Sequence, residues 1–117
     1  MARVLPTPLT TQVTGHSARV ELQPGASLTD FQGHFAQFAL LPGVTQIDWA
    51  IRFARQLLAT PTRFSGMEVI KFQEPIEPDM RVTLELNWLA DKNKLTFSYS
   101  SPKGVHSSGR IKLEPDA

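Results

Sequence analysis

The chain has 117 residues, of which 41% are hydrophobic and 20% are charged, and its formal net charge is +1. This size and balance predict one soluble globular domain, and the small net charge argues against nucleic-acid binding, which needs a concentrated basic surface. No apolar stretch is long enough to span a bilayer and no signal-like run is present near the start, so we expect a cytoplasmic protein. The absence of cysteine excludes disulfides and thiolate chemistry.

The beginning of the chain predicts an extended lead-in and then one strand. Residues 1–12 contain two prolines and several threonines without a regular period, so we expect an extended or frayed segment. Between Ser17 and Gln23, apolar and polar residues alternate, which indicates a half-buried strand. We assign the whole chain, residues 1–117, to a single domain.

One helix is predicted to begin at Pro42 or Gly43 and to end at about Leu58 or Ala59. Proline suits the first helical position, where its missing N–H would have no partner, and a second proline at position 61 ends the helix. Apolar residues at helical spacing form a single stripe, which we expect to face the core: Val44, Ile47, Ile51, Ala54 and Leu58.

The second half changes to a period of two and predicts four strands. They span about residues 67–73, 81–89, 94–100 and 105–113, and hairpin-type connections join the later ones. A single helix must bury its apolar stripe against the sheet, which gives a two-layer α+β domain. We therefore predict the hotdog fold, an antiparallel sheet wrapped around one central helix, and expect two copies to pair because the core is thin.

Three residues form a candidate catalytic set. Asp48 lies within the apolar stripe, where it either reaches water at the edge or belongs to a site. His34 alone would be read as an ordinary loop histidine. Gly43 lies at the helix N-terminus, where unpaired N–H groups could hold a carbonyl oxygen. Together they suit removal of a proton next to a carbonyl, with the enolate-like oxygen held by the helix. No spacing suited to a metal is present, so we predict no metal.

The same residues carry a resemblance to a known family. The segment "GHFAQFALLPGVTQIDWA" resembles the active-site segment of β-hydroxyacyl-ACP dehydratases of the FabA/FabZ type, in which an acidic residue follows the histidine by fourteen positions. His34, Gly43 and Asp48 match that spacing, and "VTQIDWA" is most similar to the ApeI-like thioester dehydratases. Ala36 and Ala39 replace prolines of the family pattern, and residues 77–79 lack the glycine of its later turn.

The resemblance implies dehydration of a 3-hydroxyacyl thioester to a trans-2-enoyl thioester, in fatty-acid-like or aryl polyene-type synthesis. His34 would take the C2 proton, Asp48 would assist departure of the β-hydroxyl as water, and Gly43 N–H would hold the thioester oxygen. It further implies an acyl carrier protein as partner, no cofactor, and a homodimer, or a higher oligomer of dimers, whose subunits share each site. Candidates for lining an acyl tunnel, each of which could instead be core, are Phe31, Phe35, Phe38, Leu40, Leu41 and Trp49.

Several alternatives stay open at this point. The chain could be a hotdog thioesterase, in which a carboxylate activates water, or a non-catalytic acyl-binding subunit. Arg52, Arg55 and Arg63 could meet an acidic carrier protein or form a solvated surface. The sequence does not decide whether the enoyl product is also isomerised, nor which acyl group is used.

Overall fold

The computed structural model describes residues 5–25 and 40–115, which form one antiparallel sheet and one long helix. The chain order begins with β1 (Thr10–Thr14), β2 (Ser17–Leu22) and α1 (Gly43–Leu58). The remaining elements are β3 (Arg63–Phe72), β4 (Val82–Leu89), a short 3-10 helix (Ala90–Lys92), β5 (Lys94–Ser101) and β6 (Gly104–Glu114).

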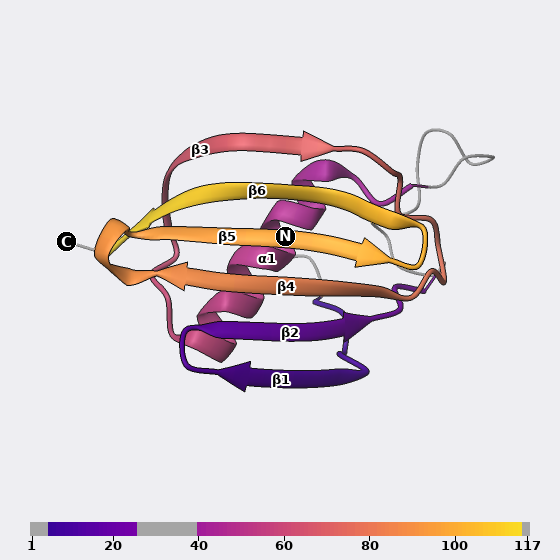
Figure 1. The fold of residues 1–117 in the computed structure, drawn as a ribbon, viewed down its shortest axis with the longest axis horizontal. Helices are drawn as coiled ribbons and strands as arrows, with labels where there is room; N and C mark the ends of the chain where they lie inside the picture. The colour runs from indigo at the N-terminus through magenta and orange to yellow at the C-terminus, as the bar shows by residue number, and fades with distance from the viewer. Residues whose placement is uncertain (1–4, 26–39, 116–117) are drawn as a thin grey trace.

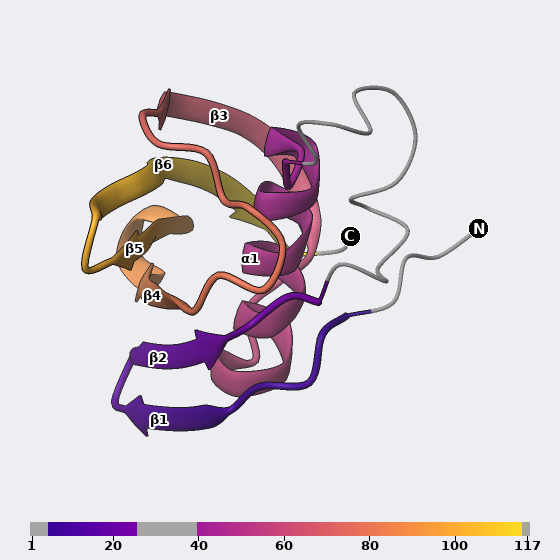
Figure 2. The same cartoon turned by 90° about the vertical axis from the view of Figure 1, so that its right-hand side faces the viewer.

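The six strands lie in the order β1-β2-β4-β5-β6-β3, and every neighbouring pair is antiparallel. β3, the first strand after the helix, therefore lies at the opposite edge of the sheet from β1, and these two are the edge strands. The sheet curves around α1, which crosses behind it (Figures 1 and 2). The predicted hotdog arrangement is confirmed by this architecture.

The edge strand β1 overlaps the last three residues of the lead-in expected over residues 1–12, and the sequence did not identify it as a strand. Thr10 to Thr14 pair with β2 across a hairpin at Gly15 and His16, and Gly15 takes a positive φ of 57° there. All five β1 residues are exposed, so no alternation marks the strand in the sequence. Backbone pairing with β2, rather than side-chain burial, forms it.

The helix begins and ends where the sequence predicts. Pro42 is its N-cap residue, with extended backbone angles, and Ala59 closes it in the left-handed region at φ 54°. Arg55 donates a hydrogen bond to the carbonyl of Thr60 at 3.0 Å, which satisfies a main-chain group just past the end.

The buried face of α1 differs from the predicted stripe. The helix residues that are buried are Thr45, Gln46, Trp49, Ala50, Phe53 and Ala54. Val44 is 64% exposed, and Ile47 and Ile51 are only partly buried. The large rings of Trp49 and Phe53, one turn apart, are buried against the concave side of the sheet, whereas Val44 points outward and Ile47 and Ile51 pack against the edge of the core. The expectation that the predicted stripe faces the core was wrong for Val44.

The core lies between α1 and the inner face of the sheet. Inward side chains from β2, β4 and β5 alternate with outward ones that are mostly polar, as the period of two predicts, and β6 also contributes buried side chains. The fully buried apolar residues of these strands include Val20, Leu22, Leu84, Leu86, Leu95, Ile111 and Leu113. Burial of each such side chain contributes about 1.5–3 kcal/mol, which fixes the helix, and hence its N-terminus, against the sheet.

Candidate functional site

A cavity of about 520 Å³ lies at the N-terminus of α1. Its lining residues come from two segments, the start of the helix and the end of β3 with the loop after it: Leu40, Leu41, Gly43, Gln46, Phe72, Gln73, Glu74 and Pro75. The first N–H groups of a helix have no intrahelical acceptor and carry partial positive charge. The cavity therefore offers an oxygen-bearing ligand a place beside these donors.

Gly43 lies directly against an aromatic ring. A Cβ atom built on Gly43 would be 2.6 Å from Cζ of Phe72, so only glycine leaves room for that ring in its present position. Phe72 is 53% exposed and lines the cavity. The ring of Phe72 thus occupies the space beside the Gly43 backbone. Any ligand that reaches this backbone would contact or displace the ring.

Asp48 lies on the outward side of α1. Its side chain is 43% exposed, and Oδ2 is 3.5 Å from a guanidinium nitrogen of Arg52 one turn later. Asp48 therefore reaches solvent one turn after the exposed Val44, at the edge of the apolar stripe, as one of the two alternatives for it anticipated. Its predicted role at a substrate remains a prediction.

A buried tyrosine ties the helix to the sheet near this carboxylate. Tyr99 of β5 is fully buried, and its hydroxyl donates a hydrogen bond to the main-chain oxygen of Gln46 at 2.7 Å. Burial, and to a smaller extent the negative charge of Asp48, raise the pKa of Tyr99 well above its ordinary value of 10.0. The phenol therefore stays protonated and continues to donate this hydrogen bond.

Four of the predicted site residues lie outside the described residues: Phe31, His34, Phe35 and Phe38. Of the remaining tunnel candidates, Leu40 and Leu41 line the cavity, and Leu41 is also buried in the core. Trp49 is fully buried in the core cluster and is not among the cavity residues, so core packing is what the structure shows for it. Within residues 5–25 and 40–115, no cluster of His, Asp or Glu is arranged to hold a metal.

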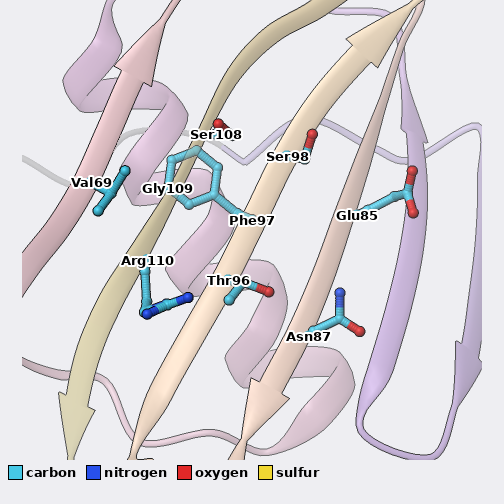
Figure 3. Close-up of a pocket in the computed structure, with 9 residues that line it drawn as sticks. All are labelled: Val69, Glu85, Asn87, Thr96, Phe97, Ser98, Ser108, Gly109 and Arg110. Atoms are coloured by element: carbon cyan, nitrogen blue, oxygen red, sulfur yellow. The ribbon is translucent and has the colours of Figure 1, made fainter.

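A second hollow, of about 480 Å³, lies on the outer face of the sheet. Figure 3 shows its polar side chains on β4, β5 and β6, with α1 on the far side of the sheet: Glu85, Asn87, Thr96, Ser98, Ser108 and Arg110. Glu85 lies 3.7 Å from Arg19, and Arg110 lies 3.6 Å from Glu68. Exposed ion pairs of this kind are worth little, and none of the predicted site residues lies here.

Sequence reasoning missed three residues at the helix-terminal cavity. Phe72 lies within the strand predicted at about residues 67–73 and Gln46 within the predicted helix, but neither was named as a site residue. His106 was also not among the predicted site residues, yet it is almost fully buried and lies beside the loop that lines the cavity. No signal in a single sequence reveals these placements, because they depend on how β3, β6 and α1 meet.

The fold and this cavity define a hotdog domain. The dehydratase domain of the CurF module of curacin polyketide synthase shares the fold, with a TM-score of 0.64 at 17% identity over 97% of this chain and 44% of that one. Among the described residues, no helix is long and apolar enough to cross a membrane.

More specific comparisons give the family. The model of the ApeI-like family, described as ApeI dehydratase, matches residues 10–110. A chain of the dehydratase heterocomplex ApeI:P from Xenorhabdus doucetiae is 40% identical, with a TM-score of 0.87 over 94% of this chain and 98% of that one. An uncharacterized protein from Erwinia carotovora subsp. atroseptica is 41% identical, with a TM-score of 0.79 over 96% and 98%. Comparison with curated protein sequences gave no match.

The chain therefore belongs to the ApeI-like dehydratase family. The resemblance seen in the sequence is confirmed at this level, and the family supports thioester dehydration as the class of reaction.

Proposed function

We propose that this protein dehydrates a 3-hydroxyacyl thioester, carried on the phosphopantetheine arm of an acyl carrier protein, to a trans-2-enoyl thioester. The observation that carries the proposal is the ApeI-like family match over residues 10–110, a range that contains His34, Gly43 and Asp48. We place the reaction in fatty-acid-like or aryl polyene-type synthesis on the same basis.

The proposed reaction uses one acid–base pair and one set of backbone donors. Neutral His34 removes a proton from C2, and the electrons of that C–H bond form the C2–C3 double bond. The C3–O bond breaks, and Asp48 donates a proton to the departing hydroxyl, which leaves as water; the proton taken by His34 then returns to Asp48 by way of solvent. Gly43 N–H holds the thioester oxygen while negative charge develops on it. Atoms and electrons balance without an oxidant or a group donor, so the proposal requires no cofactor.

We further propose that the active unit is a homodimer in which His34 of one subunit meets Asp48 of the other. Two features support pairing with a second copy: the exposed Val44 on the outward side of α1, and the edge strand β3. On β3 the exposed apolar side chains are Phe64, Met67, Val69 and Phe72. A long, exposed, hydrophobic edge strand is a surface that proteins normally cover. The relative from Xenorhabdus doucetiae is part of a heterocomplex, so a different chain is the alternative occupant.

Incubation with 3-hydroxyacyl and with plain acyl thioesters tests the reaction. We expect enoyl formation from the former and no release of free thiol from either. Thiol release without enoyl product would instead identify a thioesterase, and tight binding without turnover would identify a non-catalytic acyl-binding subunit. Comparison of the same acyl group on a carrier protein and on coenzyme A would then decide the carrier.

Complementation between inactive variants tests the shared site. If His34 and Asp48 act across a symmetric dimer, co-expression of His34→Ala and Asp48→Ala chains should restore roughly one quarter of wild-type activity, because a mixed dimer regains one intact site. If both residues act within one chain, the mixture would stay inactive. Light scattering on the purified protein would distinguish a homodimer from a monomer that awaits another chain.

A further inference from the structure

Two consecutive residues of β6, His106 and Ser107, both face the interior of the protein. Neighbouring residues of a regular strand point to opposite faces. Here Ser107 pairs with Tyr99 while Val105 pairs with Ser100, so His106 is an extra residue in β6. Such a β-bulge re-aims side chains and is common beside functional sites. The result is that two buried polar side chains point from one place on β6 toward the cavity at the start of α1.

Ser107 holds the helix side of that cavity through Gln46. Its hydroxyl donates a hydrogen bond to Oε1 of Gln46 at 2.6 Å, and Nε2 of Gln46 donates to the main-chain oxygen of Leu41 at 3.0 Å. The N–H of Leu41 in turn donates to the oxygen of Ile76 at 2.8 Å. Both polar main-chain groups of Leu41, two residues before Gly43, are therefore fixed by buried partners.

His106 holds the opposite side. Its main-chain oxygen accepts hydrogen bonds from the N–H groups of Gln73 and Glu74, at 2.8 and 3.2 Å. Its Nδ1 lies 3.2 Å from the carbonyl oxygens of both Glu74 and Pro75, so this nitrogen must carry the proton. Nε2 then accepts the hydroxyl of Ser101 at 2.6 Å. The loop that follows β3 is thus tied to β6 through both the backbone and the ring of His106.

We infer that Ser107 and Gln46 are positioning residues for the proposed dehydration site, with His106 fixing the facing wall. Through Leu41 they set where the chain enters α1, and so where the N–H of Gly43 points. Donors to a developing oxyanion must be held in place before the reaction, and a shift of about 1 Å can cost roughly 10²-fold in rate. This inference rests on the proposed function.

The test uses substitutions that remove the hydrogen bonds but leave most of the packing. Gln46→Met and Ser107→Ala should each lower kcat by about 10- to 100-fold. In Ser107→Ala, whose side chain does not line the cavity, KM should change by no more than about threefold. The double variant should be no slower than Gln46→Met alone, since both act through one path. Ser107→Thr, which keeps the hydroxyl, should recover most of the lost kcat.

Ser108→Ala is the matched control. It removes the same hydroxyl one position along the same strand, but Ser108 lines the outer hollow on the other face of the sheet (Figure 3). Its kcat should equal that of the wild type. A role in stability alone would lower the melting temperature of Gln46→Met and Ser107→Ala while leaving kcat within about twofold at temperatures well below melting, and that result would overturn the inference.

Hydrogen exchange separates failure of this inference from failure of the proposed function. If the wild type forms no enoyl product, the proposed function is wrong, whatever the variants do. In either case the amide of Leu41, which donates to Ile76, should exchange faster in Ser107→Ala than in Ser108→Ala, because its backbone is no longer held. Equal exchange in the two variants would show that Ser107 does not position this segment.

Discussion

Two hollows among the described residues are of similar size, and they use polar residues in opposite ways. Beside the cavity at the start of α1, about 520 Å³, two buried polar side chains, Gln46 and His106, are bonded largely to main-chain groups, while Gln73 and Glu74 at its rim are exposed. The hollow on the outer face, about 480 Å³, is lined by exposed and half-buried side chains such as Glu85 and Arg110. The first set determines backbone geometry, whereas the second mainly meets water.

This contrast has an energetic basis. A buried polar group costs free energy unless it is hydrogen-bonded, so it persists where its bonds specify a structure. An exposed ion pair contributes between zero and about 1 kcal/mol and constrains little. Substitutions around the cavity at the start of α1 should therefore change turnover or the free energy of unfolding. Matched substitutions on the outer face of the sheet should change neither quantity.

The largest expected effect is on turnover, and it comes from the Asp48 carboxylate. Asp48→Asn keeps the shape but loses the acid–base group, so turnover of a 3-hydroxyacyl thioester should fall by about 10²- to 10⁴-fold. Because Asp48 is partly exposed and its pair with Arg52 lies at the surface, the melting temperature should hardly change. Glu85→Gln is the outer-face control and should retain full activity. Full activity in Asp48→Asn would remove Asp48 from the mechanism.

The next effect concerns two glycines of the sheet. A Cβ atom at Gly109 would lie 2.3 Å from Cδ1 of Ile70 and 2.9 Å from the ring of Phe97, whereas a Cβ at Gly66 meets open space. Gly109→Ala should therefore destabilise the protein by about 1–3 kcal/mol through overpacking, and Gly66→Ala should be neutral or slightly stabilising. Chemical denaturation measures both. Equal stability of the two variants would contradict the tight packing on the inner face.

The sequence predicted the parts of the fold that follow from local periodicity. The strand alternation around Leu84 and Leu86 and the helix start at Pro42 depend on near neighbours in the chain, and both are confirmed. β1 was missed because its residues are all exposed, and its pairing with β2 leaves no pattern in side-chain type.

The site was predictable only in part, for a different reason. Gly43 could be placed at the helix start because proline and glycine mark that position, and the cavity does lie beside it. The burial of His106 could not be predicted, since it depends on a bulge that changes which face of β6 a residue occupies. The helix has two apolar rows, and the choice of Trp49 and Phe53 over Val44 for the core depends on the curvature of the sheet.

A smaller effect is expected at Tyr99. Tyr99→Phe removes one buried hydrogen bond to Gln46 and should cost about 1 kcal/mol at neutral pH. Because the folded-state pKa of Tyr99 is raised, its contribution is complete below the unfolded-state value of 10.0 and is lost as the pH rises above it. The variant should therefore lose less stability than the wild type between neutral and strongly alkaline pH. Ser98→Ala, on the outer face, should show the wild-type pH dependence.

The smallest expected effect concerns an ion pair in solvent. The hydrogen bonds from Arg81, at 2.8 and 3.1 Å, and from Thr10, at 2.9 Å, hold the pKa of Glu21 below its ordinary value of 4.5. The stability from this depressed pKa is present above the unfolded-state value and is lost as the pH falls through the folded-state value.

Arg81→Met should raise the pKa of Glu21 toward 4.5, measured by NMR titration, and added salt should reduce the difference in pKa between the wild type and the variant. Lys112→Met, which removes a surface charge near the opposite end of the sheet, should leave Glu21 unchanged. Since this pair is exposed, the melting temperature of Arg81→Met at neutral pH should stay close to that of the wild type; a fall as large as that of Gly109→Ala would mean that surface pairs also determine this fold.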